Sequence, residues 1–100
     1  MTIEIHENDT LEILVTVIDK TTSLAKDISG ATITAVAANI RGSTLTAVTA
    51  ITSAVDGEFT ATFAADIFTI GQWTFQARAV IGSEDQIVSD ELIQVVPAYL

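Results

Sequence analysis

The side chains that could perform acid-base or nucleophilic chemistry are few in this chain and lie far apart. His6 is the only histidine, and the chain has no cysteine. A Ser-His-Asp site needs a serine held against such a histidine, and no G-x-S-x-G stretch is present to expose a serine nucleophile. We therefore interpret His6 as a solvated residue on a strand. The sequence predicts no catalytic residues, and we expect that the chain is not an enzyme.

Oxygen ligands for a metal ion are more numerous, but their spacing matches no known binding loop. Four aspartates that could approach a calcium ion fall in expected loops: Asp19, Asp27, Asp56 and Asp66. None of them belongs to a D-x-D-x-D-G loop. Glu84 and Asp85 are adjacent in an expected turn, where acidic side chains are normally solvated. Since a single histidine cannot supply a usual zinc site, we predict no metal and no other cofactor.

The overall charge excludes some partners. The formal net charge is -9, from 13 acidic and 4 basic residues. Such a chain repels phosphate backbones, so we expect no nucleic-acid partner. No apolar run reaches the roughly 18 residues that a membrane span needs, so no membrane partner is expected. Residues 1–20 lack the pattern of a signal peptide, which predicts synthesis in a cytoplasm.

Alternation of apolar and polar residues with a period of two dominates the chain and predicts strands. It is clearest at residues 58–63, where Phe59, Ala61 and Phe63 alternate with polar residues. Strands are expected at 2–6, 11–19, 31–40, 43–52, 58–63, 72–81 and 86–96. Turn formers separate these runs, and Asp56-Gly57 is a strong hairpin signal. With 100 residues, the chain is predicted to form a single all-β domain, 1–100.

The aromatic residues indicate how the strands pack. Four of them share inward positions and are expected in one core: Phe59, Phe63, Trp73 and Phe75. The stretch near 65–70 is predicted to form one short helical turn that carries the chain from one sheet to the other. Together these features favour an immunoglobulin-like β-sandwich of about seven to eight antiparallel strands.

Apolar residues also fall at positions that point away from this core. Val36, Val48 and Val80 are predicted on outward faces, where a sheet could offer a dry contact area. Pro97 ends the last strand, which leaves Tyr99 and Leu100 beyond it. We therefore predict these five residues as contacts with a protein partner. An ordinary surface that neighbouring strands partly cover, with an unordered tail, is the alternative.

Three short motifs recur in a known order. They are Asp27–Ala31 (DISGA), Asp56–Phe59 (DGEF) and Gly71–Phe75 (GQWTF). In this order the chain resembles the immunoglobulin-like modules of tailed-phage structural proteins, including the amino-terminal domain of siphophage baseplate upper proteins. The resemblance extends over nearly the whole chain. It implies a virion protein that binds other virion proteins.

The resemblance leaves the place in the virion open. Because no receptor-binding region follows Leu100, we favour a capsid decoration protein that binds the assembled shell over a tail or baseplate module. The expected partners are the major capsid protein, or tail and baseplate proteins, together with further copies of the chain. A glycan-binding or adhesion module is the alternative from another class, for which Phe68 and Tyr99 are the only candidate exposed rings.

Overall fold

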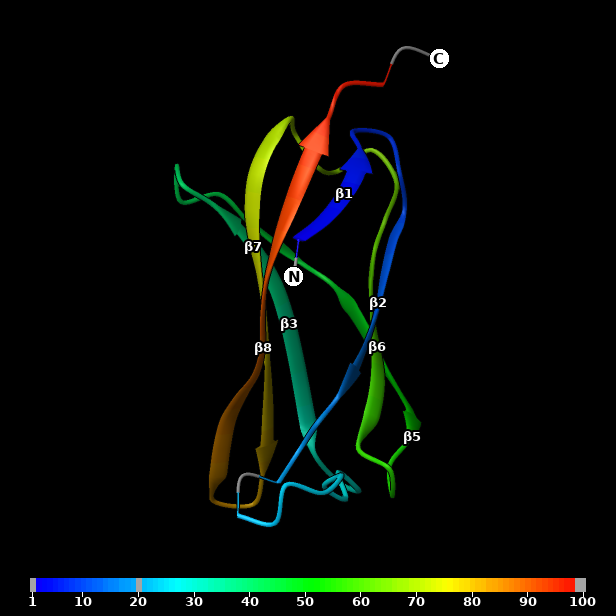
Figure 1. Cartoon of the computed structure of the whole chain (residues 1–100), viewed down its shortest axis with the longest axis vertical. Helices are drawn as coiled ribbons and strands as arrows, with labels where there is room; N and C mark the ends of the chain where they lie inside the picture. Colours follow the sequence, from blue (N-terminus) through cyan, green and yellow to red (C-terminus); the bar gives the residue numbers. More distant parts are fainter. Residues whose placement is uncertain (1, 20, 99–100) are drawn as a thin grey trace.

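The computed structural model describes residues 2–19 and 21–98, and for residues 88–90 it describes the backbone alone. The molecule is elongated, 45 × 24 × 20 Å, and built from strands (Figure 1). The strands are β1 (Thr2–His6), β2 (Leu11–Thr16), β3 (Thr32–Asn39), β4 (Thr44–Thr46), β5 (Val48–Ser53), β6 (Glu58–Phe63), β7 (Gly71–Ile81) and β8 (Glu84–Val96). The prediction of an all-β domain is confirmed.

The strands form two sheets. The larger sheet has the order β1-β8-β7-β3-β4, and the smaller sheet has the order β2-β6-β5. The prediction that all pairs are antiparallel is wrong at one edge, because β1 runs parallel to β8 from Thr2↔Leu92 to His6↔Val96. The reason is that β1 and β2 belong to different sheets. The chain runs up beside β8, turns at residues 7–10 and enters the smaller sheet as β2 (Figure 1).

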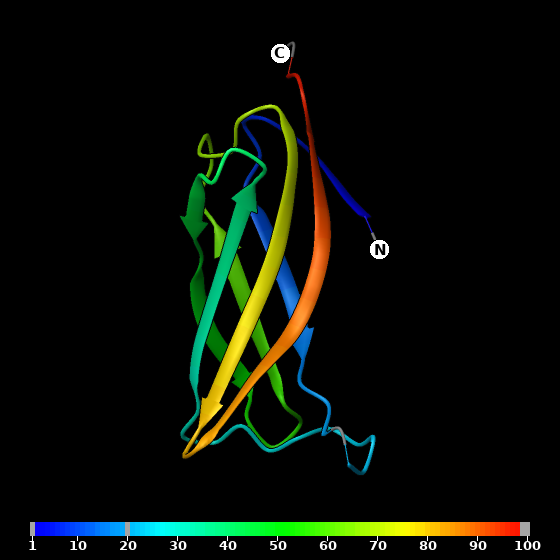
Figure 2. The ribbon, with the colours of Figure 1, turned by 90° about the vertical axis from the view of Figure 1, so that its left-hand side faces the viewer.

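The run predicted as one strand over 43–52 is divided at Ala47. Thr44–Thr46 pairs with β3 in the larger sheet, whereas Val48–Ser53 pairs with β6 in the smaller sheet. Ala47 is buried between them, and its N–H donates to the Ala35 carbonyl at 2.9 Å. The chain therefore crosses from one sheet to the other here, so that β4 and β5 lie along the same long side of the molecule (Figure 2).

The predicted helical turn near 65–70 is wrong. The described residues contain no helix, and hence no helix long and apolar enough to cross a membrane. Asp66 has a φ of 65°, which places it in the left-handed region and prevents a right-handed helical turn. The segment still closes one end of the core, because Phe68 is buried edge-on against Phe63 and Trp73, with ring centroids 5.1 and 5.4 Å apart.

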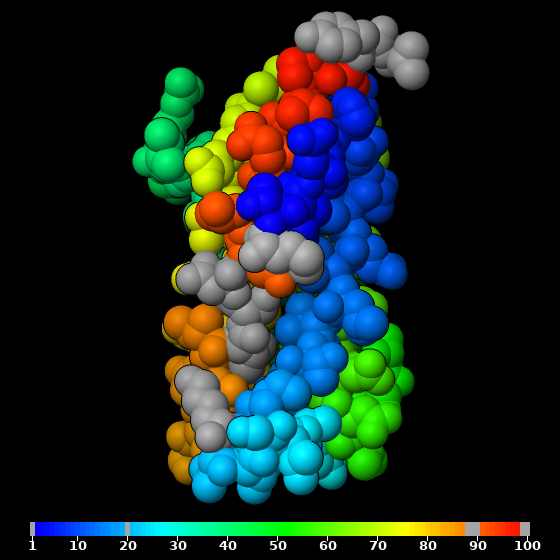
Figure 3. Space-filling model, viewed as in Figure 1, coloured from blue at the N-terminus to red at the C-terminus, as the bar shows by residue number. Residues whose placement is uncertain are grey.

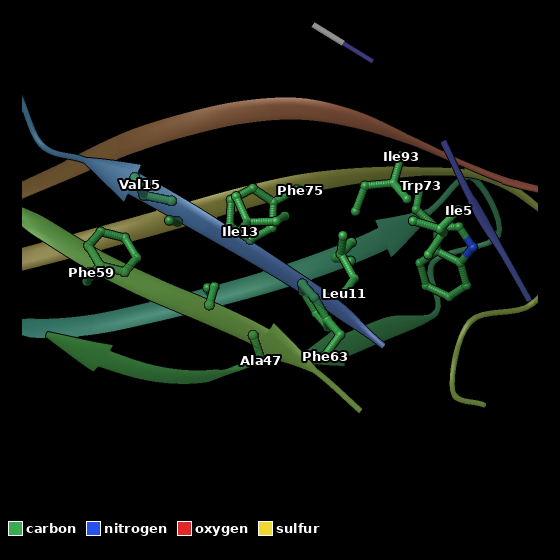
Figure 4. Close-up of a cluster of buried hydrophobic side chains, with 14 of the residues drawn as sticks. Ile5, Leu11, Ile13, Val15, Ala47, Phe59, Phe63, Trp73, Phe75 and Ile93 are labelled. Carbon is green, nitrogen blue, oxygen red and sulfur yellow. The ribbon is translucent and has the colours of Figure 1, made fainter. Parts of the chain in front are cut away.

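The core between the sheets contains the predicted aromatic residues, Phe59, Phe63, Trp73 and Phe75, which are all buried (Figure 4). Their common core is confirmed. Small residues of β3 and β7 are buried in the same core, among them Ala35, Ala37 and Ala77. Large side chains packed against small ones let the two layers approach closely without voids. The indole N–H of Trp73 donates to the Thr69 carbonyl at 3.0 Å, so the ring is buried with its polar atom satisfied.

The loop between β2 and β3 packs against the turn between β5 and β6. Gly57 in that turn has a φ of 70°, and its carbonyl accepts the N–H of Val17 at 2.8 Å. The Val17 carbonyl in turn accepts the N–H of Lys26 at 2.9 Å. Ile28, fully buried, donates its N–H to the Ala54 carbonyl at 2.8 Å. The Asp-Gly signal therefore marks a true hairpin turn, and that turn also anchors the loop.

Candidate functional site

His6 lies at the end of β1 and takes part in a local turn. Its Nδ1 is 3.6 Å from Asp9 Oδ2, and both side chains are about half exposed. The same carboxylate accepts the backbone N–H of His6 at 2.9 Å. Among the residues whose side chains the structure describes (2–19, 21–87 and 91–98), no serine hydroxyl makes a hydrogen bond to His6. The geometry around His6 is that of a polar turn.

The aspartates considered as calcium ligands bind their own loops. Asp19 Oδ1 accepts the backbone N–H groups of Thr21 at 2.8 Å and Thr22 at 3.3 Å. These hydrogen bonds lower the pKa of Asp19 below 3.8, and the positive charge of Lys26 lowers it further. Asp19 Oδ1 is thus held by the turn, and Oδ2 lies 3.9 Å from Lys26 Nζ.

Asp27 is held in the same way. Its Oδ1 accepts the hydroxyl of Ser29 at 2.6 Å and the Ser29 backbone N–H at 2.9 Å. Both bonds lower the pKa of Asp27 below 3.8. Asp56 accepts the Ser53 hydroxyl at 2.9 Å. Within the part of the chain that the structure describes, no three acidic or histidine side chains gather as metal ligands.

The two adjacent acids that were predicted in a solvated turn are the first residues of β8; they are exposed, and each also makes an ion pair. Glu84 Oε2 lies 2.7 Å from Lys26 Nζ, and Asp85 Oδ1 lies 3.2 Å from Arg78 Nε. The bond to Glu84 raises the pKa of Lys26. The Lys26 pair ties the long loop to the β7–β8 hairpin, whereas the Arg78 pair lies on the exposed face of the larger sheet.

The predicted partner contacts do not form one surface. Val36 and Val80 lie on the outer face of the larger sheet, where both are half-buried. Val48 is 75% exposed on β5, at the edge of the smaller sheet. Tyr99 and Leu100 lie outside the described residues. The sequence therefore predicted the outward orientation of these three valines, but only Val48 is exposed, and it lies on a different sheet from Val36 and Val80.

The outer face of the larger sheet has a shallow depression of about 270 Å³. It is lined by Thr34, Val36, Gln76, Ala77, Arg78 and Ile87. Ile87 is half exposed there, and the sequence pattern did not predict it as a surface residue. Strict alternation along β8 would place it on the core side with Ile93, but the pairing register shifts between Ala77 and Arg78, and Ile87 then pairs with Arg78.

A second hollow of about 350 Å³ lies where the β3–β4 hairpin meets the start of β7. Its lining includes Asn39, Ile40, Arg41, Ile70 and Trp73. The hairpin stands out from the body of the molecule as the green projection in Figure 3. Ile40 at its tip is 95% exposed. An aliphatic side chain so far from the core adds nothing to folding, although single exposed aliphatic residues are common on surfaces.

No protein-family model matches the chain, and no curated protein matches it in sequence. Its functional assignment therefore depends on its own surfaces.

Proposed function

We propose that the chain is a non-enzymatic, immunoglobulin-like structural module of a bacteriophage virion, and that it decorates the assembled capsid shell. The observation that carries this proposal is the outer face of the larger sheet. Val36 and Ile87 line a shallow hollow there together with Arg78, and Val80 lies further along the same face. A flat, partly apolar sheet face of this kind is suited to contact with another protein.

The strand order supports the immunoglobulin-like part of the proposal. In immunoglobulin-type sandwiches, strands B, E and D share one sheet, while C, F and G share the other. Here β2-β6-β5 corresponds to the first set and β3-β7-β8 to the second. The tryptophan differs, because antibody domains carry it on strand C, whereas Trp73 lies on the strand that corresponds to F. The likeness is therefore one of strand order rather than of a core motif.

The surface also indicates how docking would work. Apolar burial contributes about 25 cal/mol per Å², whereas an exposed ion pair contributes only about 0–1 kcal/mol. Contacts of Val36 and Ile87 would therefore dominate the affinity for the shell. The net charge of -9 would speed the approach to a basic surface without fixing the geometry.

Reconstitution tests the docking face. Purified shells that lack the protein are mixed with the wild-type chain or a variant, and bound protein is measured by sedimentation. We expect Ile87→Glu to lower occupancy strongly, because it places a carboxylate in the dry contact. Leu14→Glu is the matched control, since Leu14 is 62% exposed on the outer face of the other sheet. Equal loss with both variants, or with neither, would contradict docking by the larger sheet.

Copy number separates decoration from its alternatives. Gel densitometry of purified virions should show hundreds of copies for a shell protein and at most tens for a tail or baseplate part. Glycan binding has less support from the surface, because the aromatic rings of the described residues are all buried, including Phe68. Saturable binding on a glycan array, with no binding to shells, would favour that function instead.

A further inference from the structure

The acidic residues are distributed unevenly over the molecule. Residues 28–55 contain no Asp or Glu, and Arg41 is their only charged residue. These residues form β3, β4 and β5. Figure 2 shows β4 and β5 along one long side, with β8 and the N-terminal segment on the opposite side. The elements β1, β2 and β8 and the turn after β1 carry most of the acids: Glu4, Glu7, Asp9, Glu12, Glu84, Asp85, Asp90 and Glu91.

The acid-free side ends in the outer edge of β5. β5 pairs with β6 on one side, and no other strand of the described residues pairs with it. In an antiparallel pair, alternate residues direct their N–H and C=O groups away from the neighbour, so β5 presents such groups at its outer edge. Proteins usually protect an edge of this kind with a charge, a proline or a β-bulge. Residues 43–55 contain no charge and no proline, and the pairing of β5 with β6 is irregular only after Ile51, where the register shifts.

The opposite edge of the same sheet is different. β2 carries Glu12 on its exposed face. Glu12 pairs with Thr62 of β6, and Thr62 in turn pairs with Val48 of β5. β1, at an edge of the larger sheet, carries Glu4 and His6 outward. At β5 the corresponding exposed side chains are Val48 and Ala50, and Ile51 is 42% exposed. Thus β5 is an uncharged, partly apolar edge, whereas these two other edge strands carry outward charges.

We infer that β5 is a self-association edge, which pairs antiparallel with β5 of a second copy around a two-fold axis near Ala50. Charge selects this occupant. A second copy also carries -9, so its approach is repelled wherever acids face it, and β5 itself carries none. The nearest acids, Asp56 and Glu58, lie beside Ser53 at the end of the strand. Pairing through β5 keeps the two acidic sides far apart. A basic partner would instead be drawn to the opposite side.

This arrangement satisfies the geometry of an isologous contact. The same strand contributes from both copies, and the two small sheets join into one continuous sheet, β2-β6-β5 followed by its symmetry mate. Ala50 then faces its own counterpart, with Val48 and Ile51 beside it. A single strand pair buries less than the roughly 1,200–2,000 Å² of a stable interface, so the dimer should be weak and depend on concentration.

Salt gives the dimer a distinctive signature. Two copies of the same sign repel, and about 0.5 M NaCl shortens the Debye length to about 4 Å. Added salt should therefore strengthen the association. An association driven by opposite charges would weaken under the same conditions.

Sedimentation velocity of the purified full-length chain, from micromolar to millimolar concentration, tests the inference. We expect a monomer-dimer equilibrium that shifts toward dimer with salt. Ala50→Glu should raise the dissociation constant of the dimer about tenfold or more, because two carboxylates then face each other at the axis. Leu14→Glu is the matched control: it adds the same charge to the same face, and Leu14 and Ala50 pair with the same residue, Thr60. Leu14→Glu should change the dissociation constant of the dimer by no more than about twofold, because residue 14 lies far from the two-fold axis.

Several outcomes would overturn the inference. These are a monomer at all concentrations, equal weakening by Ala50→Glu and Leu14→Glu, or dissociation by salt. Val48→Glu provides a second variant at an exposed position should Ala50→Glu fail to fold, and circular dichroism checks the fold of each. The inference does not depend on capsid decoration, because the measurement uses purified protein alone.

Discussion

Replacement of Gly57 by alanine should destabilise the fold far more than replacement of any exposed turn glycine. An added Cβ would lie 2.5 Å from the Lys26 carbonyl oxygen and 2.7 Å from that of Val17. Both are backbone atoms, and contacts below 3.0 Å essentially do not occur for real Cβ atoms. The loop between β2 and β3 would therefore have to move away from the turn.

The expected loss of stability follows from two contributions. Holding alanine at a φ of 70° costs about 1–2 kcal/mol. Moving the loop disrupts two hydrogen bonds, Val17 N–H to Gly57 O and Lys26 N–H to Val17 O, worth about 0.5–1.5 kcal/mol each. The free energy of unfolding should fall by about 2–5 kcal/mol. For a chain of this size, that lowers Tm by about 10–25 °C.

Urea unfolding measures this loss, with the fluorescence of the only tryptophan, Trp73, as the signal. Gly82→Ala is the matched control, because Gly82 also has a positive φ, 58°, yet a Cβ added there would meet no atom within 4 Å. Gly82→Ala should lower the free energy of unfolding only by the cost of holding alanine at a positive φ, about 1–2 kcal/mol. If Gly57→Ala is no more destabilising than Gly82→Ala, the loop does not pack on the turn as tightly as these distances require.

Three further predictions concern the core, the loops and a turn. Trp73→Ala should lower the unfolding free energy by about 3–5 kcal/mol in a thermal melt, and a Tm within a degree or two of wild type would contradict its core position. Folding lowers the pKa of Asp19 and of Asp27, so the folded state binds fewer protons than the unfolded state. The two carboxylates therefore stabilise the folded state above about pH 4. This contribution is lost as the pH falls below 3.8. Urea midpoints between pH 7 and pH 2 should show this decline, and it should be smaller in a variant with both aspartates replaced by asparagine. Asn39→Ala should cost about 1 kcal/mol in the same assay, because Asn39 Oδ1 accepts two backbone N–H groups of the β3–β4 turn.

The core was predictable because alternation with a period of two needs only the identity of successive residues. Phe59 and Phe63 alternate with threonine and glutamate, so their common face follows from strand geometry alone. The same logic failed where geometry interrupts the alternation. Nothing in the local sequence marks Ala47 as the point at which a run of Thr, Ala and Val changes sheet. That change depends on the burial of Ala47 and its bond to Ala35, which is distant in sequence.

The prediction of a helical turn near 65–70 was wrong for a different reason. Residues 64–71 include helix-compatible types, but Asp66 adopts a positive φ, which aspartate tolerates better than most residues and which a right-handed helical turn does not allow. The parallel pairing of β1 was equally hidden, since antiparallel neighbours are the default for short connections. For Ala47 and for β1 the deciding contact is with a residue distant in sequence, which a local pattern does not reveal.

The surfaces show how two functions of one small sandwich could be kept apart. The outer face of the larger sheet contains Val36 and Ile87, whereas the β5 edge contains Val48, and a molecule only 24 × 20 Å in cross-section presents them in different directions. One partner could thus dock on the sheet face while a second copy pairs along the edge. Because the two sites share no strand, Ile87→Glu and Ala50→Glu should act independently of each other.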